Sequence, residues 1–265
     1  MSEFKHALAA LVLVSLAGGV AAASEDDAAI RDLAAEARLP PATRGALDAE
    51  LRAAQHDGVP AALLFDRVEE GLAKGAAAGE IESLVRSEHT TFAQAARLLR
   101  DAAPAAVKGA GSRSAIEAVG EALSAGVEAK HLGTLLAEPS RARGNVPPLA
   151  EEVRARAEAL AGLAERGFPS SGSVELLASA VQRGHERQAL RAVSGAAERL
   201  DREGRGPREP LLGRLHDELS RGRSPGELYG AVAAALPRSS QPEKKLKRLD
   251  RGPDRDAAFS HAPGK

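Results

Sequence analysis

The chain has no cysteine and no tryptophan, and aromatic residues make up only 2% of its 265 residues. The missing cysteine excludes disulfides, thiolate metal sites, thiol catalysis and lipid attachment at a cysteine. The scarcity of aromatic rings argues against sugar-binding clefts and platforms for single-stranded nucleic acid, because both depend on stacking. A formal net charge of -1 gives no electrostatic reason to expect a polyanionic partner for the whole chain.

Strand patterns are also missing. Alternating apolar and polar runs rich in Val, Ile and Thr are absent, whereas apolar residues recur at spacings of three and four throughout. The composition, 43% hydrophobic and 28% charged, is that of a globular chain with enough apolar residues for a core. The sequence therefore predicts an all-α protein.

A glycine with the same apolar neighbours recurs four times and predicts a repeat of helical units. The four glycines are Gly75, Gly126, Gly184 and Gly222. Aliphatic residues lie six positions after each glycine (Ile81, Leu132, Leu190, Leu228), three before it (Leu72, Leu123, Val181, Leu219) and seven before it (Val68, Val119, Leu177, Leu215). We expect four irregular helix-Gly-helix-Gly-helix units, arranged as a short α-solenoid or a folded helical bundle.

The first glycine of each unit also recurs. Gly58, Gly109 and Gly167 lie seventeen residues before their partner glycines, and the last unit slips to Gly204 or Gly206. Glycine at the end of a helix suits a left-handed cap, so we expect these positions to terminate helices.

The spacing also predicts individual helices. In the first unit we expect helices over 43–57, 60–74 and 79–88, and in the second a separate helix over 91–107 followed by one over 114–125. Ser114 and Glu117 have the spacing of a capping box, which makes Ser114 the expected N-cap of that helix.

Composition divides the chain into five parts. Residues 1–23 resemble a signal peptide, 24–138 hold a leader helix and the first two repeats, and 149–236 hold the last two repeats. A segment rich in Pro, Ser and Arg over 139–148 predicts a linker between the two halves, and 237–265 form a basic tail.

The N-terminal segment has the features of a secretory signal. Lys5 precedes an apolar run, and small residues at Ala21 and Ala23 predict cleavage before Ser24. An uncleaved anchor is the alternative, although the apolar run is short for a membrane span. We expect a periplasmic or secreted bacterial protein with no transmembrane span in its mature chain.

The tail is predicted to be disordered because it has too few apolar residues to offset the entropy of ordering. It carries eight basic and four acidic residues, with a basic patch at Lys244, Lys245, Lys247 and Arg248. Such a patch could make weak contacts with anionic surfaces. We expect no specific nucleic-acid partner.

One short motif could indicate a nucleophilic serine. Gly222, Ser224 and Gly226 match G-x-S-x-G, and Asp250 and His261 follow in the chain order of a hydrolase triad. A nucleophile elbow needs a strand before the serine, however, and here a helix is expected. We therefore interpret Ser224 as the N-cap of a helix, in a capping box with Glu227.

No other pattern indicates chemistry. No two of the seven histidines are three or four residues apart, which is the helical spacing that metal pairs favour. We expect no catalytic residues, no metal and no cofactor. The favoured function is a surface for another envelope or secreted protein. An enzyme of the hydrolase type with a site between repeats, and an envelope-associated protein held by its tail, are the alternatives.

Overall fold

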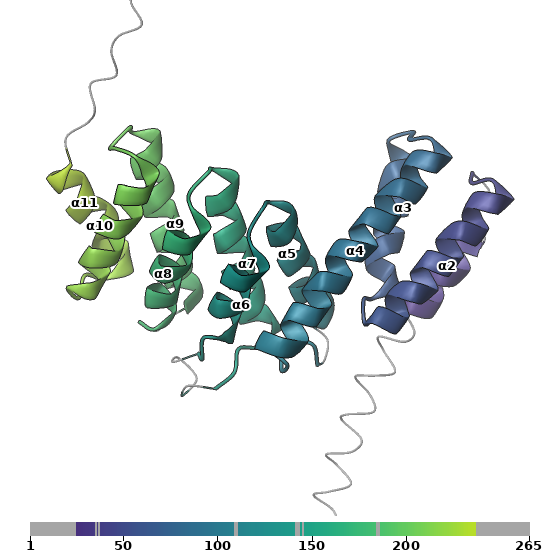
Figure 1. Ribbon diagram of the computed structural model, residues 1–265, viewed down its shortest axis with the longest axis horizontal. Coiled ribbons are helices and arrows are strands. Elements are labelled where there is room, and N and C mark those ends of the chain that lie inside the picture. Colours follow the sequence, from purple (N-terminus) through teal and green to yellow (C-terminus); the bar gives the residue numbers. More distant parts are fainter. Residues whose placement is uncertain are drawn as a thin grey trace, which may run out of the picture.

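The protein is all-helical, as predicted, and its helices lie side by side in an elongated row in the computed structural model (Figure 1). The structure describes residues 25–34, 36, 38–108, 111–140, 144, 146–183 and 186–236. Across these residues there is no strand, only one isolated antiparallel bridge between Ser140 and Val146. The predicted signal peptide, Ser24, the whole of the basic tail over 237–265, Gly109 and Gly184 lie outside the described residues.

A helix over residues 25–34 comes first. The helices after it are α2 (Pro41–Asp57), α3 (Ala61–Ala73), α4 (Ala78–Ala102), α5 (Ser112–Ser124), α6 (Ala129–Ala137), α7 (Ala150–Glu165), α8 (Ser170–Val181), α9 (Glu186–Arg202), α10 (Arg208–Ser220), a short 3₁₀ helix η2 (Pro225–Glu227) and α11 (Leu228–Ala235). Within the described helices, none has a stretch long and apolar enough to cross a bilayer.

The helices pack in two layers along most of the row. From α5 onward, α5, α7, α9 and α11 pack successively on one another, and so do α6, α8 and α10 in the other layer. Consecutive helices such as α7 and α8, or α9 and α10, also touch across the layers. Near the N-terminal end α4 crosses from α2 and α3 to α5 and α6, so it joins the α2–α3 pair to the two-layered part of the row (Figure 1).

The apolar positions around the recurring glycines form the core. All four residues six positions after a glycine are buried, at no more than 1% exposure, and so are all four that lie seven positions before one. Val181 and Leu219 are buried as well, while Leu72 and Leu123 are partly buried against the same core. One continuous hydrophobic cluster includes residues from Leu33 to Val232.

Six helix ends share one hydrogen-bond pattern built on a glycine. At Gly58, Gly75, Gly126, Gly167, Gly204 and Gly222, φ lies between 64° and 93°. Each glycine N–H donates to the carbonyl three residues earlier, and the next N–H donates to the carbonyl five residues before it. This is the Schellman motif, and it requires a left-handed residue that glycine adopts without strain. Gly204 has this role, and Gly206 does not.

Two sequence predictions near α4 and α5 are wrong. The helices expected over 79–88 and 91–107 are one helix, α4, which continues to Ala102. No glycine or proline lies between Glu80 and Ala102, so nothing in the sequence stops its hydrogen-bond ladder there. The expected capping box at Ser114 is absent, because α5 begins earlier, with Gly111 as its N-cap. The Ser114 hydroxyl donates instead to the Gly111 carbonyl at 3.0 Å.

His89 fixes α4 against α2 at the point where a break was expected. Its side chain is almost fully buried, and its two ring nitrogens lie 2.6 Å from Glu50 Oε1 and 3.1 Å from Asp57 Oδ2. Both carboxylates belong to α2. The middle of α4 is therefore held by polar contacts as well as by apolar packing.

The segment predicted as a linker packs on α7. Ser140 is fully buried, and its hydroxyl donates to Glu152 Oε1 at 2.9 Å. The Arg156 side chain is also fully buried, and its Nη1 donates to the carbonyls of Leu135 and Glu138 at 3.1 and 2.5 Å. A cation at these carbonyls offsets the partial negative charge at the end of α6. Helix α5 packs on α7 across this segment, and the division into two halves stays a prediction.

A polar cluster holds α11 at the C-terminal end of the row. The Tyr229 hydroxyl donates to Glu203 Oε1 at 2.6 Å, and the Arg199 guanidinium lies 3.8 Å from the Tyr229 ring centroid. Arg205 Nη1 donates to the carbonyls of Ala233 and Leu236 at 3.2 and 2.6 Å. The Tyr229 hydrogen bond, and then Arg205 and Arg199, lower the pKa of Glu203 to about 2.

This shift predicts an acid-dependent stability. Because the folded pKa of Glu203 lies below its unfolded value, its contribution is complete above the unfolded pKa near 4.5 and disappears as pH falls toward 2. The Glu203→Gln variant should melt below the natural chain at pH 7, and the two melting temperatures should converge between pH 4.5 and 2. Thermal unfolding followed by circular dichroism across this range measures the gap. A gap that does not change with pH contradicts the prediction.

Candidate functional site

The serine of the G-x-S-x-G motif is a helix cap. Ser224 follows α10 and precedes η2, its hydroxyl donates to Glu227 Oε2 at 2.8 Å, and its N–H donates to the same oxygen at 3.1 Å. These two bonds lower the pKa of the Glu227 carboxyl. With a helix rather than a strand before it, Ser224 has the geometry of a capping box and not of a nucleophile elbow.

No metal cluster is found in the described part of the chain, because no three His, Asp or Glu side chains there converge as metal ligands would. His131 and His216 lie on different helices, α6 and α10. Five of the predicted repeat glycines, Gly58, Gly75, Gly126, Gly167 and Gly222, end helices as described above and line no shared site.

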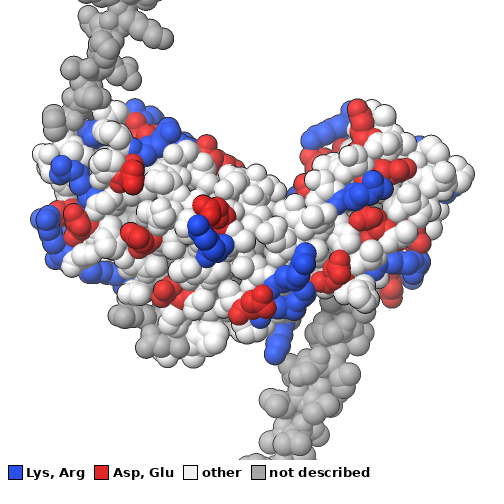
Figure 2. Space-filling view, in the orientation of Figure 1, with Lys and Arg blue, Asp and Glu red and all other residues white. Residues whose placement is uncertain are grey.

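The largest hollow among the described pockets lies where α4 crosses between the two ends of the row. It has a volume of about 600 Å³ and is bounded by α3, α4, α5 and α7. Figure 2 shows the surface notched between the α2–α3 end and the rest of the molecule, above α4. We call this hollow, with the residues that line it, the acidic groove.

Glutamates from three helices line the acidic groove. Glu88 comes from α4, Glu121 from α5, and Glu158 and Glu165 from α7, and Arg67 of α3 is the one cation in the lining. Small residues fill the remaining wall: Ser124, Ala125, Ala161 and Gly162. Because these side chains are short, the carboxylates stand out from a surface that a partner chain can approach closely.

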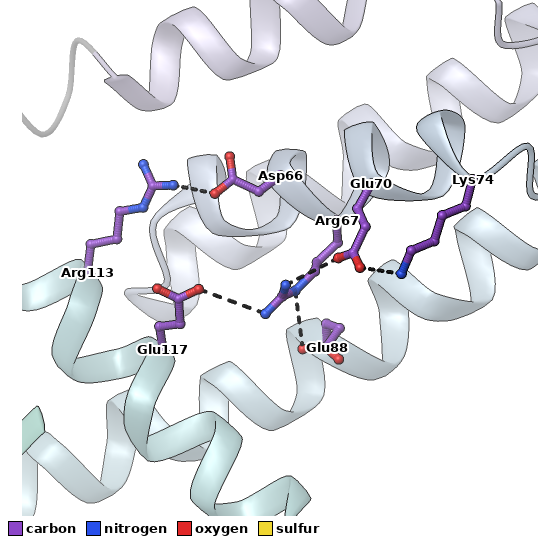
Figure 3. A network of polar contacts seen from close by, with 7 residues as sticks. All are labelled: Asp66, Arg67, Glu70, Lys74, Glu88, Arg113 and Glu117. Atoms are coloured by element: carbon purple, nitrogen blue, oxygen red, sulfur yellow. Dashed lines mark hydrogen bonds and ion pairs between the residues drawn. The ribbon is translucent and has the colours of Figure 1, made fainter. Parts of the chain in front are cut away.

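Arg67 is at the centre of a polar network on one wall of the groove (Figure 3). Its guanidinium nitrogens lie 3.4 Å from Glu70 Oε2, 4.0 Å from Glu88 Oε2 and 3.9 Å from Glu117 Oε1. The contacts to Glu88 and Glu117 are long, and Arg67 is shared among three carboxylates. A single guanidinium therefore neutralises only part of the negative charge around it.

The rest of the network extends along α3 in both directions from Arg67 (Figure 3). Lys74 Nζ lies 2.5 Å from Glu70 Oε1, and Arg113 of α5 pairs with Asp66 of α3 (Figure 3). The lysine and the hydrogen bond that it donates lower the pKa of the Glu70 carboxyl. The Arg113 pair links α3 to α5 beside the groove, so it helps to hold the two walls at a fixed separation.

The pKa of the Glu121 carboxyl is raised, whereas that of Glu70 is lowered. Partial burial of this group, followed by repulsion from Glu117 and from the more distant Glu158 and Glu165, raises its pKa, although Arg67 lowers it in part. Glu121 and Glu165 have no ion pair or hydrogen bond through their carboxyl groups with any residue that the structure describes. The groove thus holds carboxylates that repel one another and that an arriving cation would stabilise.

Sequence reasoning did not find the acidic groove. A partial signal was present, because Glu117 and Glu121 are four residues apart on α5 and Glu158 and Glu165 are seven apart on α7, so each pair shares a helix face. Nothing in the spacing shows that these two faces meet on the same side of α4. That meeting depends on how the helices cross.

No protein-family model, curated protein or solved structure matches this chain. The chemistry of the groove is therefore argued from its geometry alone. Converging carboxylates on a concave wall attract cationic groups, and the small residues between them leave room for a peptide main chain.

Proposed function

We propose that this protein is an exported, non-enzymatic helical-repeat protein that presents an interaction surface to another protein of the bacterial envelope or its surroundings. The acidic groove is the proposed contact, and a segment carrying lysine or arginine is the proposed ligand. Export rests on the signal-like N-terminus with its cleavage site before Ser24. Mass spectrometry of the N-terminal peptide of the native protein tests it, and a mature chain that keeps residues 1–23 contradicts it.

The repeat architecture supports a binding role. We infer that the helices form an open, short α-solenoid of four irregular units, because the same glycine ends recur and the same flanking apolar positions are buried. The two packed layers also place each helix against the next helix in the chain and the next but one. Such arrays expose extended surfaces, and they use those surfaces for partner proteins.

The observation that carries the proposal is the imbalance of charge in the acidic groove. Four glutamates and one arginine line it, and two of the glutamates have no cationic partner in the described chain. The carboxyl of Glu121 is already partly desolvated there. A lysine or arginine side chain that enters the groove removes this repulsion, and because Glu121 and Glu165 are exposed, added salt screens the attraction.

A charge-reversal variant tests the groove. We expect the double variant Glu121→Lys and Glu165→Lys to bind a fluorescent lysine-rich peptide at least about tenfold more weakly than the natural mature chain, because two attractions become two repulsions. Fluorescence anisotropy at low ionic strength measures the dissociation constant. The affinity of the natural chain should also fall as salt is added.

A matched control separates the groove from net charge. Glu175 on α8 and Glu209 on α10 are exposed and line a second, smaller acidic hollow, so their replacement by lysine changes the charge of the chain by the same amount at a site away from the groove. This control should bind the peptide almost as the natural chain does. Equal weakening of both variants would mean that the peptide senses only overall charge, and the groove would lose its assigned role.

The same pair of variants identifies the physiological partner. Cross-linking in the native cell, purification from the envelope fraction and mass spectrometry should recover one protein in near-equal amount with the natural chain. The control variant should retain this protein and the groove variant should lose it. Recovery of the same protein with both variants would place its binding site elsewhere on the surface.

A further inference from the structure

We propose that the basic segment 243–248 of this same chain occupies the acidic groove and competes there with the external partner. This inference rests on the proposed function of the groove. It adds that the chain's own tail competes with the partner for the same site. It follows from three features: where negative charge gathers, where positive charge gathers, and how far the chain can reach between them.

The charge of the chain is divided between its body and its tail. Residues 237–265 carry eight basic and four acidic side chains, so the tail has a net charge of +4. The signal-like segment 1–23 contributes one charge of each sign, and the whole chain is -1, so residues 24–236 carry -5. The two parts therefore attract each other, and the most concentrated basic run, Lys244 to Arg248, is the tail's strongest cationic element.

Among the described residues, the acidic groove is the larger of two hollows with an excess of carboxylates. The pocket between α7 and α9 is lined by Arg154, Arg187 and Arg191 together with Glu151 and Glu158, so it has a small excess of positive charge. The hollow between α8 and α10 is lined by Glu175, Glu209 and Asp217 without lysine or arginine, and it measures about 280 Å³. The acidic groove has Arg67 against four glutamates, of which Glu158 also pairs with Arg154, and at about 600 Å³ it has more room for a basic segment.

The chain is long enough to reach the groove. Helix α11 packs on α9 and α9 packs on α7, whose Glu158 and Glu165 line the groove. Two helix-to-helix steps reach α7, and a third, from α7 to α5, crosses the groove, so the groove lies about 20 to 30 Å from α11. Lys244 is eight residues beyond Leu236, which ends the described chain, and eight extended residues cover about 26 Å. Because the tail is covalently attached, its effective concentration at the groove is on the order of millimolar, so weak contacts suffice for occupancy.

The absence of cysteine makes a direct distance measurement possible. We would replace Ser124, which lines the groove, and Leu246, within the basic run, by cysteine and label the pair for energy transfer. High transfer at low salt, lost in the Glu121→Lys and Glu165→Lys background and kept in the Glu175→Lys and Glu209→Lys background, is the expected result. A label pair at Ser220, exposed at the end of α10, and Leu246 is the position control and should show lower transfer.

Dilution distinguishes a tail bound to the groove of its own chain from a tail bound to the groove of a second copy. Transfer within one chain is independent of protein concentration, whereas transfer between chains appears only when both labels are mixed and falls on dilution. Concentration-dependent transfer would overturn the proposal in favour of a trans contact. Low transfer at Ser124 at all salt concentrations would overturn it outright.

Neutralising the tail connects occupancy to function. In the full mature chain, replacing Lys244, Lys245, Lys247 and Arg248 by glutamine should strengthen binding of the lysine-rich peptide by about three- to tenfold, because the competitor is removed. If the glutamine variant of the tail binds the peptide as the natural chain does, while the Glu121→Lys and Glu165→Lys variant loses binding, the tail proposal fails and the proposed function of the groove stands. If reversal at the groove also has no effect, the proposed function fails.

Discussion

Replacing Arg156 by alanine should lower the free energy of unfolding by about 3 to 5 kcal/mol, among the largest effects of any single change in this chain. The guanidinium is fully buried and donates to the carbonyls of Leu135 and Glu138, with a longer contact of 3.4 Å to Leu136. Alanine leaves these oxygens without their donor and opens a cavity between α6 and α7. Both effects destabilise the folded chain and leave the unfolded chain unchanged, because the unfolded chain has neither the cavity nor the buried carbonyls.

Arg154, two residues earlier on α7, is the matched control. It is 44% exposed in its side chain, and its ion pair is with Glu158 on the same helix, at 2.9 Å. Arg154→Ala should therefore cost no more than about 0.5 kcal/mol. Chemical denaturation of both variants, followed by circular dichroism, gives the two values. Similar costs for the two would show that the buried guanidinium contributes no more than a surface one.

Phe92→Ala should cost about 3 to 5 kcal/mol, because Phe92 is fully buried at the crossing of α4 and α5 and its loss leaves a large cavity. The ring packs against Gly120 so closely that a β-carbon on Gly120 would lie 2.5 Å from the ring's Cδ1 atom. Gly120 is next to Glu121, and Phe92 is one turn beyond Glu88. The contact therefore sets the position of two groove residues as well as stabilising the fold.

A double-mutant cycle isolates this contact. Gly120→Ala alone should cost about 1 to 3 kcal/mol, because the new methyl group meets a ring that cannot move in the packed core. In a Phe92→Leu background the same change should cost much less, since the ring is gone. Gly162→Ala on α7, where a β-carbon has open space, is the control and should stabilise the chain by up to about 1 kcal/mol, because alanine favours the helix. Additive costs at positions 92 and 120 would contradict the packing described.

The sequence was sufficient to predict local structure wherever a local rule decided it. The spacing of Ile81, Leu132, Leu190 and Leu228 predicted helix faces, and all four are buried. The S-x-x-E spacing at Ser224 predicted a cap that the structure contains. At Ser114 the same spacing was misleading, because α5 begins before it and its hydroxyl bonds back to Gly111. A serine three residues before a glutamate cannot by itself say where a helix begins.

The acidic groove could not be predicted in the same way. Its walls come from α3, α4, α5 and α7, which are separated by as many as ninety-eight residues between Arg67 and Glu165. Whether their charged faces converge depends on the crossing of α4 over α5, and that crossing is possible because Gly120 accepts the Phe92 ring. A single sequence identifies Gly120 as a helical glycine and gives no sign of what lies against it.

The position of Tyr229 has a spectroscopic consequence. It is the only tyrosine in a chain without tryptophan, and it lies on α11, against Glu203 and Arg199. Its fluorescence therefore reports the environment of one end of the row, while the far-ultraviolet signal averages over every helix. Because packing is mainly between neighbouring helices, the terminal helices can separate before the middle of the row unfolds. Tyr229 is thus an intrinsic probe of unfolding at the C-terminal end of the row. The difference between the unfolding midpoint followed by tyrosine fluorescence and the midpoint followed by far-ultraviolet circular dichroism measures how strongly this end is coupled to the middle.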